Sequence, residues 1–352
     1  MTTADVDEHL DGAGIAAHRR VSWLDAVIGR IDAAAVGRPA VFIGYAAFVL
    51  AYLHAELWLS GRAPVGTLDS TQIIRAFYVV YPIALLDYLR GVAVRAWHDY
   101  RPATDMSDAQ ADRFEFELIH APAWPLVGIA LIAAAVVAMS TSNPVVSGVA
   151  SLTGALVVTH LVALWLAVAA VFALVYETVR MLRLVSRTVA RATRVNLLKP
   201  EPLYAFSRLT LRAAIGLIAI PTFQLLVVPV DVNAQTASVL WMAMIVVAGA
   251  AAFVVPLRGI HDWIVAEKRI LQAAGADRLQ ATLERLHAAV EANDTSVDDA
   301  LGKRLASLVQ ERDLIARLPT WPWQAGTFRT LASAIALPVV VWLLTRLLGR
   351  VL

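Results

Sequence analysis

Residues 145–176 read VVSGVASLTGALVVTHLVALWLAVAAVFALVY and carry no charged side chain. A helix of about 20 mostly apolar residues is long enough to cross the hydrocarbon core of a bilayer, so this stretch predicts a membrane-spanning helix. The same reasoning applies to six further stretches, which are residues 39–59, 73–89, 124–139, 213–230, 237–255 and 331–348. The sequence therefore predicts an all-α fold, a polytopic helical membrane bundle with about seven transmembrane helices.

The composition excludes most other classes of protein. Of the 352 residues, 59% are hydrophobic and 16% are charged, and the mean hydropathy is +0.65. Soluble domains have about half apolar and about a quarter charged residues, so a soluble enzyme, a disordered chain and a β-barrel with its alternating pattern are excluded. The absence of cysteine excludes disulfides, thiolate metal sites and cysteine nucleophiles. The net charge of +2 gives no general attraction to nucleic acid.

The stretch at 73–89 is the weakest of the seven because it contains Arg75 and Asp87. If it spans the membrane and the N-terminus is cytoplasmic, 26 of the 30 basic residues lie on the cytoplasmic side. If it does not, the arginine-rich segment 177–212 lies outside, against the positive-inside bias. We therefore expect a multi-pass membrane protein with the N-terminus inside and the C-terminus outside. Because the last span is short and is followed by Arg350, a helix on the membrane surface is the alternative there.

The predicted organisation follows from these spans. The N-terminal segment is polar and acidic and has no cleavable signal sequence, so the first span directs insertion. Ser107 and Gln110 have the spacing of a capping box, which predicts a short cytoplasmic helix after them. The parts are a cytoplasmic segment at 1–38, six spans within 39–256 with cytoplasmic extensions at 93–122 and 177–212, a cytoplasmic helical hairpin at 257–318, and an interfacial elbow with the last helix at 319–352.

The hairpin is predicted from two apolar seams at near-heptad spacing. Thr295 or Ser296, in the polar turn between the seams, is expected to cap the second helix. Seams of this kind on consecutive helices favour an antiparallel helical hairpin with coiled-coil packing. The apolar side chains of the seams either pack against each other within the hairpin or pack partly against a second copy or a cytoplasmic protein partner. The seam residues are Leu279, Leu283, Leu286 and Val290, then Leu301, Leu305, Leu308 and Ile315.

A basic stripe follows the span at 145–176. Its arginines recur every three or four residues, so they lie mostly on one face of a helix that continues into the cytoplasm. Such a face is a candidate contact for anionic lipids or for an acidic partner; the alternative is a positive-inside signal that stops transfer. The arginines are Arg180, Arg183, Arg187, Arg191 and Arg194.

Ionisable residues inside spans are costly, so they are candidates for an intramembrane polar site. We expect Glu56 and Arg75 to form an ion pair across the outer hairpin, either as a structural lock or as a gate or ion site. Asp87 either pairs with Arg90 or a neighbouring helix's arginine, or binds a cation or relays a proton. His160 is either a neutral, hydrogen-bonded core histidine or a proton relay.

The second span is also the most polar of the seven. Tyr78, Tyr81 and Tyr88 share one of its faces and Pro82 interrupts it, so it is the span we expect to line a pathway if one exists. Gln224 in the fifth span is expected to make a hydrogen bond between helices.

Enzyme motifs are absent from the sequence. It contains no H-E-x-x-H, P-loop, dinucleotide glycine fingerprint or G-x-S-x-G. Glu117-x-x-His120 has the spacing of a carboxylate-bridged metal site, but no additional inward-facing glutamates are expected to accompany it. We therefore predict a protein that is not an enzyme and has no cofactor, metal site or nucleic-acid partner.

Two strings of residues carry a resemblance. RVNLLKPEPLYAFSRLT at 194–210 and LPTWPWQAGT at 318–327 are similar to stretches in an uncharacterised family of prokaryotic multi-span membrane proteins. The resemblance covers most of the chain after the first span. It implies a location in a prokaryotic plasma (inner) membrane and no activity.

Two functions of different class remain open. The first is a non-enzymatic scaffold or signal-coupling component that acts through its cytoplasmic helices, with membrane lipids around it and a homo-oligomer or protein partner at 257–318. The second is an oligomeric ion channel or small-solute transporter lined by the second span. The large cytoplasmic surface and the scarcity of intramembrane polar groups favour the first.

Overall fold

The computed structural model describes residues 22–141, 154–189, 201–229, 233, 236–292, 295–323 and 325–351. Helices account for nearly all of these residues, and no strand occurs among them, so the all-α class is confirmed. The helices are α2 (Trp23–Asp32), α3 (Arg38–Leu59), α4 (Ser70–Tyr100), η1 (Arg101–Ala103), α5 (Asp108–Ile119), α6 (Ala123–Thr141), α8 (Ala155–Val189), α9 (Glu201–Val227), α11 (Thr236–Glu291), α12 (Thr295–Arg317) and α13 (Ala325–Val351).

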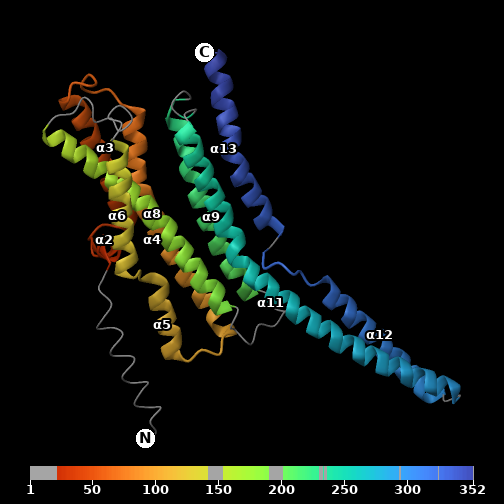
Figure 1. The fold of residues 1–352 in the computed structure, drawn as a ribbon. Coiled ribbons are helices and arrows are strands. Elements are labelled where there is room, and N and C mark those ends of the chain that lie inside the picture. Colours follow the sequence, from red (N-terminus) through yellow and green to blue (C-terminus); the bar gives the residue numbers. More distant parts are fainter. Residues whose placement is uncertain are drawn as a thin grey trace, which may run out of the picture.

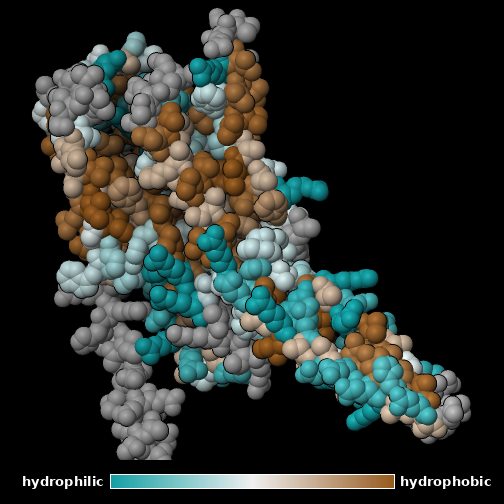
Figure 2. Space-filling view, turned by 45° about the vertical axis from the view of Figure 1, so that its right-hand side comes forward, coloured by the Kyte–Doolittle hydropathy of each residue, from teal (hydrophilic) through white to brown (hydrophobic). Residues whose placement is uncertain are grey.

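Seven helical segments within these ranges are long and apolar enough to cross a membrane, one for each predicted stretch. They correspond to α3, α4, α5 with α6, α8, α9, α11 and α13. Figure 2 shows a hydrophobic band across the visible face of the bundle and a more hydrophilic surface below it. The weakest predicted span is confirmed as a helical segment of this kind, since α4 continues through Pro82.

The centre of the bundle is formed by α4 and α9. The most apolar windows of these two helices are 56% and 61% buried, against 17% in α13. They approach closely at Gly216 of α9, where a Cβ atom would lie 2.5 Å from Leu85 Cδ1. The hydroxyl of Tyr81 donates to the Gly216 carbonyl at 2.9 Å, so the most polar of the predicted spans is an interior helix.

The N-terminal segment contains a helix that the sequence analysis missed. Ser22 caps α2 by accepting from the Asp25 N–H at 3.1 Å, and Leu24 and Ile28 are buried. Trp23 Nε1 donates to the Leu126 carbonyl of α6 at 3.3 Å. Part of 1–38 is therefore packed against the bundle.

The hairpin is confirmed, with a different geometry at its start. The span at 237–255 and the first arm form one 56-residue helix, α11, which α12 follows in the antiparallel direction (Figure 1). Thr295 is the first residue of α12 rather than its cap, while the capping box of Ser107 and Gln110 on α5 is confirmed. The arm beyond Pro256 is about 50 Å long at 1.5 Å per residue.

The hairpin seam is only partly as predicted. Val290 is 56% exposed, and Thr282 and Ala289 are buried instead. Of the other expected members, Ile315 is buried and six are half-buried, which are Leu279, Leu283, Leu286, Leu301, Leu305 and Leu308.

The base of the hairpin is joined to the bundle by the predicted elbow. The Trp321 ring stacks on His261 with centroids 4.0 Å apart and on Trp323 at 4.3 Å. Lys268 Nζ donates to the carbonyls of Ala316 and Leu318 at 2.8 and 2.9 Å. These contacts fix the level at which α12 ends beside α11.

The two ends of the bundle differ. Figure 1 places the α3–α4 connection and the C-terminus at one end, and α5 and the hairpin toward the other. Seven consecutive spans that alternate in direction place these connections and the C-terminus at the same two ends. The mapping of these ends to the inside and outside of a cell stays a prediction based on the arginine distribution.

Candidate functional site

The first buried polar cluster lies at the end of the bundle that carries the α3–α4 connection. Glu56 Oε1 of α3 and His160 Nδ1 of α8 are 2.9 Å apart, and their side chains are 4% and 1% exposed. The other oxygen, Glu56 Oε2, is buried and has no hydrogen-bond partner among the described residues. The predicted direct pair of Glu56 with Arg75 is wrong, because Glu56 turns to α8; Arg75 Nη1 donates to Gln72 at 3.5 Å.

His54 joins α3 to the start of α4 beside this cluster, and it was not predicted from the sequence. Its Nε2 accepts the Asp69 N–H at 3.0 Å, so Nδ1 carries the proton that is donated to the Leu50 carbonyl at 2.9 Å. Asp69 in turn caps α4 by accepting from the Gln72 N–H at 3.0 Å. His54 is therefore a structural link between α3 and α4, and the available signal was an ionisable side chain within an apolar span.

Two ion pairs lie nearer the opposite end, between α2, α3 and α4. Asp87 Oδ1 is 3.3 Å from Arg38 Nη1, which corrects the expected pairing with Arg90 and supports the alternative of an arginine from a neighbouring helix. Arg90 Nη2 instead lies 2.8 Å from Asp25 Oδ1, with side-chain exposures of 6% and 7%. The buried pair of Asp25 and Arg90 joins α2 to α4, and it was missed because α2 was missed.

The tyrosine face of α4 is directed at neighbouring helices. The Tyr78 hydroxyl donates to Gln224 Oε1 of α9 and accepts from Trp241 Nε1 of α11 at 3.0 Å, which confirms the predicted interhelical role of Gln224. Tyr88 is 47% exposed and lies beneath the Arg212 guanidinium. The polar groups of α4 are thus used in contacts between helices.

The basic stripe of α8 divides into different environments. Arg180 forms a bidentate pair with Glu177, whose side chain is fully buried, and donates to the carbonyls of Glu117 and Leu118 at the end of α5. The candidate lipid contact at Arg180 is therefore wrong, since this arginine satisfies the C-terminus of α5. The i, i+3 spacing of Glu177 and Arg180 was the missed signal.

The next two arginines of the stripe are exposed and line a cavity beside α8. This cavity, of about 440 Å³, lies between α8, α9 and α11. It is lined by Arg183, Ser186 and Arg187 on its polar side. Arg191 and Arg194 lie outside the described residues.

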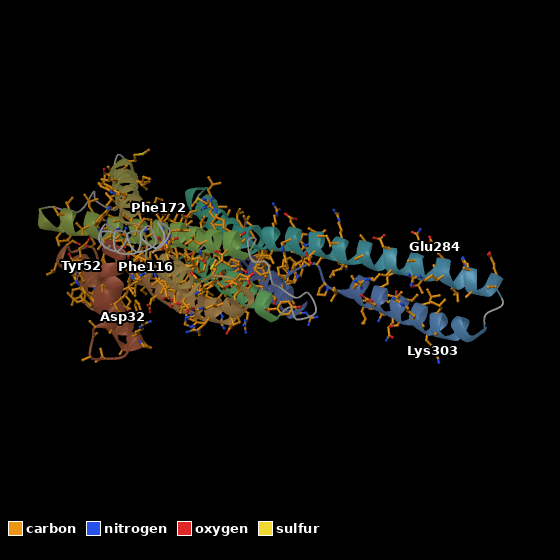
Figure 3. The ribbon with its side chains drawn as sticks, turned by 90° about the horizontal axis from the view of Figure 1, so that it is seen from below. Asp32, Tyr52, Phe116, Phe172, Glu284 and Lys303 are labelled. Atoms are coloured by element: carbon orange, nitrogen blue, oxygen red, sulfur yellow. The ribbon has the colours of Figure 1, made fainter. Side chains whose placement is uncertain are left out.

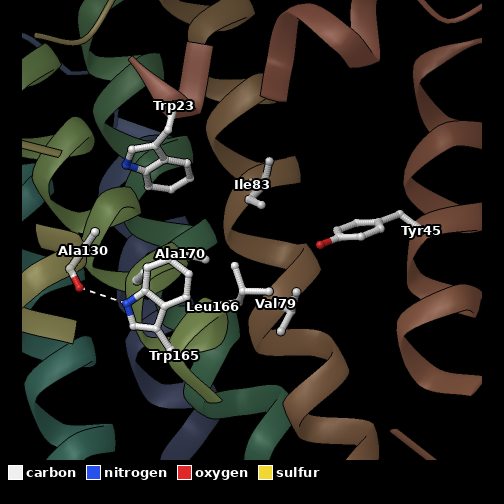
Figure 4. A pocket seen from close by; sticks show the side chains of 9 residues that line it. Trp23, Tyr45, Val79, Ile83, Ala130, Trp165, Leu166 and Ala170 are labelled. Carbon is white, nitrogen blue, oxygen red and sulfur yellow. Dashed lines mark hydrogen bonds between the residues drawn. The ribbon is translucent and has the colours of Figure 1, made fainter. Parts of the chain in front are cut away.

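A second, apolar cavity of about 90 Å³ lies between α3, α4, α6 and α8. Figure 4 shows Tyr45 pointing from α3 toward Val79 of α4, and Trp165 donating to the Ala130 carbonyl, at 2.9 Å. The lining contains no carboxylate, histidine or basic residue, so we assign no chemistry to it.

No group of three or more histidine and acidic side chains with the geometry of a metal site occurs within the described ranges. No family model, curated protein or solved structure matches the chain. The resemblance carried by residues 194–210 and 318–327 therefore stays a prediction.

Proposed function

We propose that this protein is a non-enzymatic membrane scaffold that assembles with a second copy of itself through the hairpin of α11 and α12. The observation that carries the proposal is the hairpin itself, which extends away from the bundle and is not covered by other described helices (Figures 1 and 3). In Figure 3, Glu284 and Lys303 lie on the outer sides of the two arms.

Apolar side chains remain exposed on both arms of the hairpin. Ile270 of α11 is 62% exposed and Leu314 of α12 is 58% exposed, although the hairpin carries many charged residues. Both positions point away from the seam between the two arms, by the 100° rotation per residue of a helix. Exposed apolar side chains on a projecting hairpin favour packing against another helical surface.

A second copy fits this surface for two reasons. Residues 262–317 contain ten acidic and eight basic side chains, so two hairpins do not strongly repel each other. Both copies also have the same orientation in one membrane, which presents their hairpins at the same height. A two-fold arrangement would then bring identical patches together. We place the hairpin in the cytoplasm from the arginine distribution.

The alternative function, an oligomeric channel or transporter lined by α4, has weaker support. Tyr78, Tyr81 and Asp87 of α4 contact α9, α11 and α3. These groups would reach a solvent path only if those contacts opened. Unchanged ion flux in Asp87→Asn would remove its main residue-level argument.

The proposal is tested by the stoichiometry of the purified full chain. We expect a dimer for the wild type in detergent by light scattering, and monomers for Ile270→Glu combined with Leu314→Glu. The matched control is Gln272→Glu with Ala316→Glu, which adds the same charge at exposed positions about 200° around each helix. This control should remain dimeric.

Two results would contradict the proposal. One is a wild-type monomer, including one that binds a different protein through the hairpin. The other is a dimer that the Ile270 and Leu314 substitutions leave unchanged.

A further inference from the structure

The cavity of about 440 Å³ lies between α8 and α11, with residues of both helices in its lining. At Gly259 of α11 the two helices are close, because a Cβ atom there would lie 3.1 Å from Ser186 Oγ of α8. From this contact the space between the helices opens toward the middle of the bundle, with Leu217 of α9 among the residues behind it. The lined part of α8, from Val175 to Arg187, is about 18 Å long at 1.5 Å per residue.

Within the span, the lining is apolar and made of small residues on one side. Val175 and Val179 come from α8, and Ala248, Ala251 and Ala252 come from α11. Three alanines at i, i+3 and i+4 lie on one face of α11 and leave a channel between helices where larger side chains would have filled it. Ala251 and Val179 are exposed, so this channel is accessible from the side.

At its other end the lining is basic. Arg183 and Arg187 are exposed, and no carboxylate lies within ion-pair distance of either among the described residues. Arg180, one turn earlier, differs in being neutralised by Glu177 at 2.8 Å. Within the described ranges, the cavity therefore has two positive charges that no carboxylate pairs with.

The cavity also contains a buried hydroxyl whose hydrogen-bonding capacity the described residues leave unused. Thr178 lines the cavity and is 1% exposed, and its Oγ1 has no hydrogen-bond partner among the described residues. A buried polar group without a partner is uncommon in proteins.

We propose that this groove binds an anionic phospholipid from the leaflet on the hairpin side of the bundle. The phosphate lies against Arg183 and Arg187, and an acyl chain follows the channel between Val179 and Ala251. Anionic lipids are concentrated in the cytoplasmic leaflet and attract basic residues at its surface. This leaflet is the one that the arginine distribution assigns to the hairpin side. The site is independent of the proposed role of the hairpin.

The test uses the purified full chain in neutral detergent, with phosphatidylglycerol and phosphatidylcholine of identical acyl chains as probes. Native mass spectrometry gives the apparent affinity for each lipid. We expect Arg183→Gln with Arg187→Gln to weaken phosphatidylglycerol binding roughly 30-fold, at about fivefold per arginine, with little change for phosphatidylcholine. Arg285→Gln with Arg312→Gln is the matched control, because it removes two exposed charges from the hairpin.

A second variant tests the acyl channel separately. Ala251→Phe fills it without removing charge and should weaken binding of the lipid, whereas Ala243→Phe, at an exposed position of α11 outside the lining, should not. If the arginine variant does not fold, the pair of phenylalanine variants decides the matter alone.

Three results would overturn the proposal. The first is equal loss of phosphatidylglycerol binding in the hairpin control. The second is unchanged binding in Ala251→Phe. The third is displacement of the lipid by glycerol phosphate at matched concentration, which would indicate a site for small anions rather than for lipid.

Discussion

Buried polar side chains join the helices of this bundle to one another. Glu56 pairs with His160, Asp25 with Arg90, and Tyr78 with Gln224. Each pair links different helices, so each removes a polar group from lipid and fixes the position of one helix against the next.

The pair of Glu56 and His160 gives a prediction about stability. Replacing His160 removes the partner of the buried Glu56 carboxylate, and replacing Glu56 removes the carboxylate that His160 Nδ1 contacts; each loss costs about 1–3 kcal/mol. We expect His160→Ala and Glu56→Ala each to lower the thermal unfolding temperature in detergent, while the double variant loses much less than the combined effect of the two. His287→Ala, at an exposed position on the hairpin, should leave the unfolding temperature unchanged. Additive losses would show that the two side chains do not interact.

The sequence indicated which residues are unusual, but not their partners. An ionisable residue within an apolar stretch is visible from local composition, so Glu56, Arg75, Asp87 and His160 were found. Glu56 and His160 are 104 positions apart, and which helix lies beside which is not encoded in hydropathy. For this reason the pair with His160 was not predicted.

At the level of helices, a close contact at a glycine fixes α11 against α9. A Cβ atom at Gly249 would lie 3.1 Å from the Ala214 carbonyl oxygen and 2.9 Å from Ile218 Cγ1. A backbone atom cannot move aside as a side chain does, so Gly249→Ala forces the helices apart and should cost about 1–3 kcal/mol. Thermal unfolding in detergent measures this loss. Gly44→Ala, which meets no atom within 4 Å, is the control. Equal stability of the two variants would contradict the close packing.

The docking of α2 depends on a buried ion pair. Asp25→Ala leaves the Arg90 guanidinium buried without its carboxylate, a change that costs about 3–5 kcal/mol. We expect faster amide hydrogen exchange throughout Trp23–Asp32, because the helix separates from the bundle more often. Asp32→Ala breaks a pair with Arg38 in which both side chains are partly exposed, at 41% and 53%, and should change exchange much less. Equal exchange in the two variants would argue against the role of Asp25.

Spans were predicted well because a run of about 20 apolar residues is a local property. The helix α2 was missed because it has 10 residues, of which only Leu24 and Ile28 are buried apolar residues. The continuity of α11 was also missed, because Pro256 directly follows the apolar stretch and favours a helix end there, whereas α11 continues through it.

For the whole molecule, the sequence predicted the grouping of helix ends and the hairpin, but the cavity between α8, α9 and α11 could not be found. The cavity depends on three helices meeting around small side chains such as Ala251 and Ala252. Alanine at these positions is as compatible with tight packing as with an open groove.

The most direct test of the account is disulfide cross-linking in membranes. Because the chain has no cysteine, single cysteines report on one position each. We predict that Leu314→Cys forms a covalent dimer under mild oxidation, and that Ala316→Cys, exposed and about 200° around the same helix, does not. Absence of the Leu314→Cys dimer, or equal cross-linking at both positions, would contradict assembly through the hairpin.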